Sequence, residues 1–244
     1  MHMRDGSKKY AAILATLMLA AQGVFAADLH FVKPGEVDAK TFLPAPPVAG
    51  SQEAAAELAT VLRLQDSRSD AEVARANSEA KLTPAAFQAV FGTDFTAEHL
   101  PLLFSLLMDA AADSKAISDP AKADFNNQPR PQFVDPRVKP SIADETDGSY
   151  PSGHASRGIL WASILLELAP DKKDAILARG QEIGWDRVLA GVHFPSDIFA
   201  GRVLGLTLAR VMDKNPAFQD RMAKVKAEWE AFSKAHGAKA PVAG

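Results

Sequence analysis

One short stretch of the sequence places a serine, a glycine and a histidine where they could bind a phosphate group. Tyr150-Pro151 indicates extended chain, and it runs directly into Ser152-Gly153-His154, where a helix is expected to begin at Ser152. The free N–H groups at the start of a helix bind anions, and a glycine there lets an anion approach the backbone closely. The triplet is not specific by itself, because Pro-Ser-Gly is also an ordinary helix cap.

A second stretch combines a cation, a histidine and a carboxylate. Arg187 is followed six residues later by His193, and His193 is followed four residues later by Asp197. Four residues is about one helical turn, so the carboxylate of Asp197 can accept an imidazole N–H of His193. That hydrogen bond sets the tautomer and leaves the other ring nitrogen free to attack. The spacing indicates a histidine nucleophile with an orienting partner.

Two further cations, Lys122 and Arg130, precede these stretches, and Pro131 follows the arginine. A phosphate monoester carries about two negative charges near neutrality. Three fixed cations and a helix N-terminus can stabilise the oxygens of the transferring phosphoryl group without Mg²⁺. We therefore expect neither a metal site nor a cofactor.

The elements expected to position these residues are helices. The sequence is rich in alanine and poor in Gly, Tyr and β-branched residues, which favours helix over sheet. Helices are expected to open after Ser51, at the capping box Ser69–Glu72 and at Thr83-Pro84. Longer helices are expected over 100–116, 152–168, 171–190, 195–212 and 217–235. The predicted fold class is all-α, a compact multi-helix bundle.

Residues 126–149 differ in kind from the helical segments. They are rich in Pro, Asn and Asp and show little periodicity. Long irregular segments inside compact domains are usually functional or disordered. We expect this segment to lie at the site and to influence which substrate is accepted.

Residues 1–26 are predicted to be a cleaved secretory signal peptide. The basic residues Arg4, Lys8 and Lys9 precede an apolar stretch over 10–21, and Val24-Phe25-Ala26 supplies small residues at the cleavage position. The apolar stretch is shorter than the roughly 18 residues expected of a spanning helix. The mature protein is therefore predicted to be soluble and periplasmic, with an extended Pro-rich leader over 27–50 and a single domain over 51–244.

The overall charge argues against nucleic acid as a partner. The chain has 27 Lys and Arg against 30 Asp and Glu, a formal net charge of -3, and so lacks the positive field that sequence-independent binding of nucleic acid requires. It contains no cysteine, which excludes a disulfide scaffold.

The order of the motifs resembles a known signature. It resembles the signature of the type 2 phosphatidic acid phosphatase superfamily. That signature has a lysine, then Arg-Pro, then Pro-Ser-Gly-His, and finally an arginine followed after five residues by a histidine and after three more by an aspartate. Within the superfamily, an exported chain of this size resembles the class A bacterial non-specific acid phosphatases. The resemblance implies an all-α fold and metal-free hydrolysis of small phosphate monoesters through a phosphohistidine. The family is also similar in its site to vanadium haloperoxidases.

The resemblance also implies roles for particular residues. His193 would be the nucleophile, Asp197 its orienter, and His154 the acid that protonates the leaving alcohol. The groups that would hold the phosphate oxygens are Lys122, Arg130, Ser152, Gly153 and Arg187. A homodimer is expected from the same resemblance, and exposed apolar faces on Ala-rich helices would permit it.

The sequence departs from the family pattern at two points. Seven residues separate Lys122 from Arg130 where the family has six, and on a continuous helix one extra residue turns a side chain by about 100°. We expect the non-helical stretch 126–129 to absorb it and keep Lys122 in place. Asp186 replaces the serine that the family usually has beside the arginine, so it must point away from the phosphate or pair with Arg187.

Three functions remain open at this point. The first is an exported acid phosphatase that acts on small phosphomonoesters, with no membrane and no nucleic acid as partner. The second is a vanadate-dependent haloperoxidase built on the same site. The third is a helical periplasmic protein with a weakened, phosphate-binding pocket, which the altered lysine spacing and Asp186 support. Release of nitrophenol from its phosphate ester in EDTA separates the three.

Overall fold

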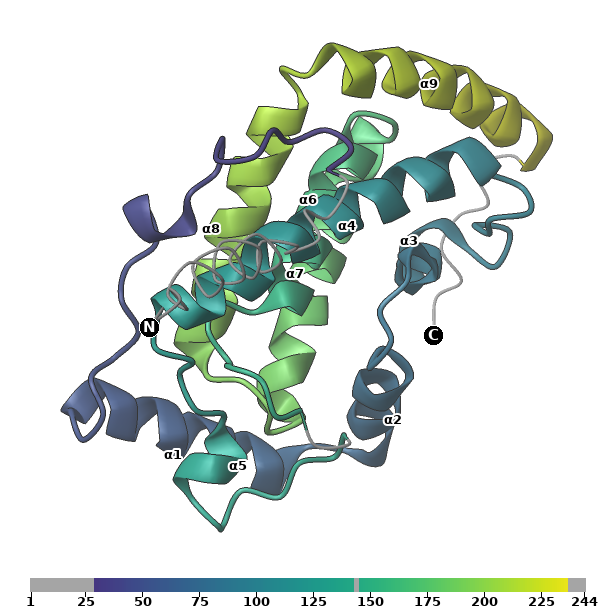
Figure 1. Cartoon of the computed structure of the whole chain (residues 1–244). Coiled ribbons are helices and arrows are strands. Elements are labelled where there is room, and N and C mark those ends of the chain that lie inside the picture. Colours follow the sequence, from purple (N-terminus) through teal and green to yellow (C-terminus); the bar gives the residue numbers. More distant parts are fainter. Residues whose placement is uncertain (1–28, 143–144, 237–244) are drawn as a thin grey trace, which may run out of the picture.

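The protein is described by a computed structural model that places residues 29–142 and 145–236. These residues form helices and no strand, and the predicted all-α fold class is confirmed. The longer helices are α1 (Gln52–Ser67), α2 (Asp70–Ser78), α4 (Pro101–Asp124), α6 (Gly153–Leu166), α7 (Lys173–Leu189), α8 (Pro195–Met212) and α9 (Pro216–His236) (Figure 1). The short ones are η1 (Ala39–Thr41), η2 (Pro84–Phe87), α3 (Gln88–Phe91), α5 (Pro131–Val134) and η3 (Pro170–Lys172). The predicted signal peptide, residues 1–26, lies outside the described residues.

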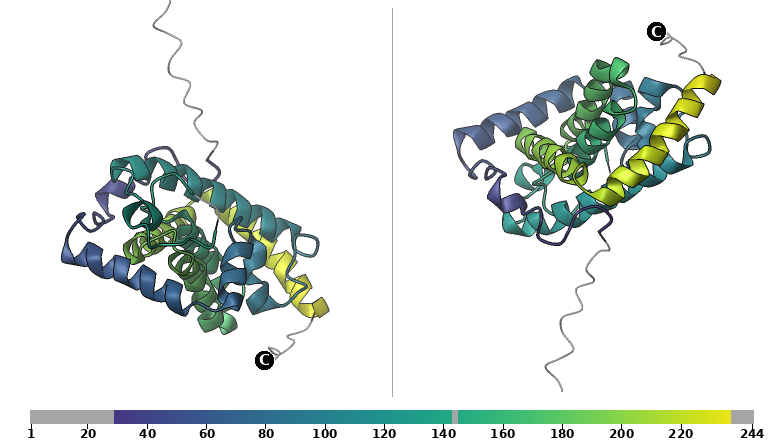
Figure 2. Two further views of the ribbon diagram at one scale, coloured as in Figure 1. Left: turned by 90° about the horizontal axis from the view of Figure 1, so that it is seen from below. Right: turned by 90° about the horizontal axis from the view of Figure 1, so that it is seen from above.

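Helix α6 lies at the centre, packed along α7 and α8 and contacted by α4, while α1 and α9 lie at the periphery (Figure 2). Glycine at the crossing points allows this close packing. A Cβ added at Gly205 of α8 would lie 2.4 Å from the carbonyl oxygen of Ser156 in α6. A Cβ at Gly158 of α6 would lie 2.6 Å from the carbonyl oxygen of Gly180 in α7. Larger side chains would force these helices apart.

The same close packing brings the starts of α6 and α8 together. A Cβ at Gly201 of α8 would lie 2.4 Å from the carbonyl oxygen of Ser152, which caps α6. The backbone N–H of Ser152 donates to the carbonyl oxygen of Asp197, in the first turn of α8, at 3.0 Å. The two motifs that the sequence places more than 30 residues apart therefore meet at one end of the bundle.

The cap predictions hold at two of three positions. The hydroxyl of Ser51 accepts from the N–H of Ala54 at 3.1 Å, and Ser69 with Glu72 forms a complete capping box. At Thr83-Pro84 a helix opens with the proline in its first turn, as predicted, but it is a 3-10 helix and the side chain of Thr83 makes no cap bond.

Helix α4 is longer than its apolar stripe predicts. It continues from the expected end at residue 116 to Asp124, because the next turns also face the core and bury Ser118 and Ala121. Its first N–H groups have no cap of their own, and the carboxylate of Glu228 in α9 accepts from Leu102 and Leu103, each at 2.9 Å. The added turns carry Lys122 to the end of the helix.

The segment before α1 packs onto the bundle. Phe31, Val32 and Val37 belong to the main hydrophobic core. The buried carboxylate of Asp113 in α4 holds the segment by accepting backbone N–H groups, including that of Phe31 at 2.7 Å. Burial of a carboxylate is tolerated there because each of its oxygens is hydrogen-bonded. In the part of the chain that the structure describes, no helix is long and apolar enough to span a bilayer.

Candidate active site

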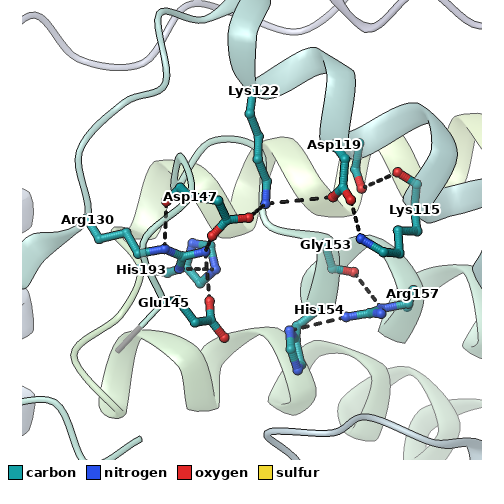
Figure 3. Close-up of a pocket in the computed structure, with 11 residues that line it drawn as sticks. Lys115, Asp119, Lys122, Arg130, Glu145, Asp147, Gly153, His154, Arg157 and His193 are labelled. Carbon is teal, nitrogen blue, oxygen red and sulfur yellow. Dashed lines mark hydrogen bonds and ion pairs between the residues drawn. The ribbon is translucent and has the colours of Figure 1, made fainter. Parts of the chain in front are cut away.

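A cavity of about 160 Å³ opens where α4, α6 and the segment before α6 meet the start of α8 (Figure 3). Its lining is strongly charged, with four Lys or Arg side chains against three Asp or Glu. The lining residues are Lys115, Ser118, Asp119, Lys122, Arg130, Glu145, Asp147, Gly153, His154, Arg157 and His193. Five of the eight residues singled out from the sequence therefore line one cavity: Lys122, Arg130, Gly153, His154 and His193.

His193 has the geometry of an activated nucleophile. Its side chain is almost completely buried, and its Nδ1 lies 3.0 Å from Oδ2 of Asp197. Its Nε2 lies 3.1 Å from Nη1 of Arg130. Because a guanidinium can only donate, Nε2 carries the lone pair and Nδ1 carries the proton that Asp197 accepts. Burial and the charges of Arg130 and Arg187 lower the pKa of His193 well below its ordinary value, which keeps that lone pair free.

Asp197 lies behind the histidine, in the first turn of α8, and has no exposed surface. Its Oδ2 also accepts the backbone N–H of Phe194 at 2.8 Å, which fixes the carboxylate against the ring of His193. Burial raises the pKa of Asp197 to about 7, although the N–H of Phe194 opposes the shift. The sequence separation of four residues thus produces the predicted contact.

Ser152 and Gly153 have different positions at the start of α6. The hydroxyl of Ser152 is fully buried and accepts from the N–H of Ala155 at 3.3 Å, so it caps the helix and does not line the cavity. Gly153 is the first residue of the helix and does line it (Figure 3). The helix N-terminus thereby faces the charged cavity, as an anion site requires.

Two carboxylates pair with the cations at this end of the cavity. Glu145 lies 2.7 Å from Nη2 of Arg130 and 2.6 Å from Nη2 of Arg187, and so bridges two guanidinium groups. Asp147 lies 2.7 Å from Nη2 of Arg130 and also pairs with Lys122. Burial works to raise the pKa of Asp147, but the hydrogen bonds from Lys122 and Arg130 outweigh it and lower that pKa to about 2. An oxyanion bound by these cations must displace both carboxylates.

Arg187 lies behind Glu145 and does not itself line the cavity. Its side chain is 1% exposed, and its Nε and Nη1 have no hydrogen-bond partner among the described residues. Buried guanidinium N–H groups without acceptors are costly. The guanidinium of Arg187 is therefore held from within the described residues only at Nη2, by the carboxylate of Glu145.

Lys122 reaches the cavity despite the extra residue before Arg130. The turn after α4 absorbs that residue, since Asn126 and Asn127 adopt positive φ values of 57° and 47° and end the helix. Asparagine tolerates this left-handed backbone better than most residues. The side chain of Lys122 is 11% exposed and points toward Asp147 (Figure 3).

Asp186 points away from the cavity, and its partner is not Arg187. The buried carboxylate accepts two hydrogen bonds from Arg75 of α2, at 2.8 Å from Nε and 2.7 Å from Nη2. This bidentate pair ties α2 to α7 next to Arg187. Of the two arrangements that the sequence left open for Asp186, the structure has the one in which the carboxylate points away from the cavity.

His154 lies near the cations of the cavity. Its Nε2 donates to the carbonyl oxygen of Glu79 at 3.1 Å, and its Nδ1 lies 3.3 Å from Nη2 of Arg157. Burial, Arg187 and Arg157 lower the pKa of His154 well below its ordinary value. The nitrogen that faces the cavity is therefore Nδ1, and it is unprotonated while the cavity holds only side chains.

Sequence analysis missed Glu145, Asp147 and Arg157. Arg157 lies three residues after His154 in α6, and that spacing on a helix was a usable signal. The two acids lie in an irregular segment, where spacing does not predict direction. Within residues 29–142 and 145–236, no three His, Asp or Glu side chains are arranged to hold a metal ion.

The fold and these residues agree with comparisons to known proteins. A family model described as the PAP2 superfamily matches residues 98–217, and the chain belongs to that superfamily. It is 29% identical to a non-specific acid phosphatase of Providencia stuartii over 93% of this chain and 100% of that protein. It is 33% identical to an acid phosphatase of Zymomonas mobilis over 68% of this chain and 66% of that protein. The resemblance inferred from the motifs is thus confirmed.

The structure is also similar to a solved bacterial vanadium-dependent iodoperoxidase. The TM-score is 0.53 at 21% identity, over 72% of this chain and 53% of that one. At this level of identity, the similarity to the iodoperoxidase shows a shared fold and nothing about activity.

Proposed function

We propose that this chain is an exported, metal-independent acid phosphatase that hydrolyses small phosphate monoesters through a phosphohistidine on Nε2 of His193. The observation that carries the proposal is the His193–Asp197 pair, with Nε2 unprotonated and beside Arg130 at the cavity. Membership of the PAP2 superfamily and the acid phosphatase relatives support it. Export rests on the sequence of residues 1–26 alone.

The first half-reaction transfers the phosphoryl group to the histidine. Arg130, Arg187 and Lys122 bind the phosphate oxygens in place of Glu145 and Asp147. The Nε2 lone pair of His193 attacks phosphorus, the ester P–O bond breaks, and the leaving oxygen takes a proton from Nδ1 of His154. Asp197 accepts the hydrogen bond from Nδ1 of His193 and so holds the ring with Nε2 toward phosphorus.

The second half-reaction uses the same groups in reverse. A water molecule attacks phosphorus while Nδ1 of His154 takes its proton, and the P–N bond breaks to release inorganic phosphate. Burial and, after it, the nearby cations lower the pKa of His154 when the site holds no phosphate. A bound phosphate dianion offsets those cations and favours the protonated acid that the first half-reaction needs. The lowered pKa of His193 keeps the nucleophile free in mildly acidic solution, which is consistent with an acid optimum.

The experiment that tests this function measures nitrophenol released from p-nitrophenyl phosphate by the purified protein. Because side-chain cations supply the charge stabilisation, EDTA should leave the rate within about twofold of the untreated rate. Vanadate adopts the five-coordinate geometry of the transferring phosphoryl group, so it should inhibit at a concentration at least about tenfold lower than phosphate does. A strict requirement for Mg²⁺ or Zn²⁺ would contradict the proposal. Halide oxidation with peroxide and vanadate, without ester hydrolysis, would identify an oxidising enzyme instead.

Glu145→Gln is expected to strengthen phosphate binding. The carboxylate of Glu145 bridges Arg130 and Arg187, and the incoming dianion must displace it. A neutral amide holds two guanidinium groups less strongly than a carboxylate. The inhibition constant of inorganic phosphate and the KM for p-nitrophenyl phosphate should therefore fall about three- to tenfold. Glu230→Gln, at an exposed position of α9, is the matched control. An unchanged or weaker affinity in Glu145→Gln would show that the carboxylate does not compete with substrate.

A further inference from the structure

Two cations of the cavity have no part in the phosphoryl transfer described above. Arg157 of α6 and Lys115 of α4 both line the cavity. Figure 3 shows them on the side opposite Arg130 and His193, with His154 next to Arg157. Three cations already serve the phosphoryl group under the proposed function, which leaves Arg157 and Lys115 for another part of the substrate.

Arg157 has an incompletely neutralised charge. Its Nε donates to the carbonyl oxygen of Gly153 at 3.2 Å, and its Nη2 lies 3.3 Å from Nδ1 of His154. Asp119 and Glu145 act on it only through space, whereas Arg130 and Arg187 each form an ion pair with a carboxylate. Burial lowers the pKa of Arg157, as expected of a desolvated cation. A partly buried guanidinium of this kind is stabilised by an oxyanion.

The position of Arg157 indicates where that oxyanion must come from. Under the proposed function, Nδ1 of His154 gives its proton to the leaving oxygen. The guanidinium adjoins that same nitrogen, so it faces the alcohol part of the substrate and not the phosphoryl oxygens. Lys115 extends the positive surface along the same wall, with Asp119 as its present partner.

We propose that Arg157 and Lys115 form a subsite for a second oxyanion carried by the leaving alcohol. The substrates that this cavity favours are then phosphate monoesters whose alcohol bears a carboxylate or a further phosphate. Arg157 supplies a planar, two-pronged donor that fits either group, and Lys115 adds a more mobile point charge. This inference rests on the proposed function and names a substrate class for the same site.

The first test compares two esters on the wild-type protein. In 3-phosphoglycerate and glycerol 3-phosphate the phosphorylated carbons are the same, and a carboxylate in the first replaces a hydroxymethyl group in the second. We expect kcat/KM for 3-phosphoglycerate to exceed that for glycerol 3-phosphate about tenfold, chiefly through KM. Equal values, or a preference for the neutral alcohol, would overturn the inference while leaving the phosphatase intact. Failure to hydrolyse either ester or p-nitrophenyl phosphate would instead overturn the proposed function.

The second test measures the same ratio in variants. Arg157→Gln should reduce the preference to about twofold or less, and Arg157→Lys should leave an intermediate preference because the charge remains without the planar fork. Lys115→Gln should weaken the preference in the same direction, and its exposed side chain makes it a safe variant for folding. Arg63→Gln, at an exposed position of α1 outside the cavity, removes the same charge and should leave the ratio unchanged. A preference that survives in both Arg157→Gln and Lys115→Gln would refute the subsite.

Discussion

Replacing His193 by alanine is expected to lower kcat for p-nitrophenyl phosphate by about a thousandfold or more. The variant loses the Nε2 lone pair beside Arg130 that, under the proposed function, forms the bond to phosphorus. The cations remain, so inorganic phosphate should still bind with an affinity within a few-fold of that of the wild type. Steady-state rates and phosphate binding by calorimetry measure the two quantities separately.

Two comparisons make the result at His193 specific. His99→Ala alters an exposed histidine and should leave kcat unchanged. Asp197→Asn should cause a large but smaller loss than His193→Ala, because an amide can donate to Nδ1 and so move the ring proton to Nε2. Retention of more than a few per cent of activity in His193→Ala would exclude this residue as the nucleophile. Acid-labile, base-stable phosphate trapped on the wild-type protein, and absent from the variant, is the expected covalent intermediate.

Replacing His154 by alanine is expected to have an effect that depends on the leaving group. Nitrophenolate departs without a proton, so kcat for p-nitrophenyl phosphate should change by less than about tenfold. The alkoxide of glycerol 3-phosphate needs a proton from Nδ1, and general acid catalysis contributes about 100- to 10,000-fold in such cases. The rate on this ester should fall by that amount, which parallel kcat measurements on both esters determine. Equal losses would show that His154 only binds phosphate.

Local features of the chain were predictable from the sequence because they depend on neighbours along it. The capping box at Ser69 and the range of α8 follow from residue types a few positions apart. The contact between His193 and Asp197 belongs to the same class, since one helical turn separates them. The predicted end of α4 was wrong because its last turns are buried by other helices and not by an apolar stripe of their own.

The partners of the charged residues were decided by the tertiary structure. Asp186 pairs with Arg75, 111 residues away, because α2 packs on α7. Arg130 meets Nε2 of His193 across 63 residues. An ion pair depends on where two elements pack, and residues so far apart in the chain leave no periodic pattern to indicate it. The type and order of the chemical groups could therefore be deduced from the sequence. Only the packing of α4, α6, α7 and α8 decided that Glu145 and Asp147 pair with Arg130 and that the cavity forms beside His154 and Arg157.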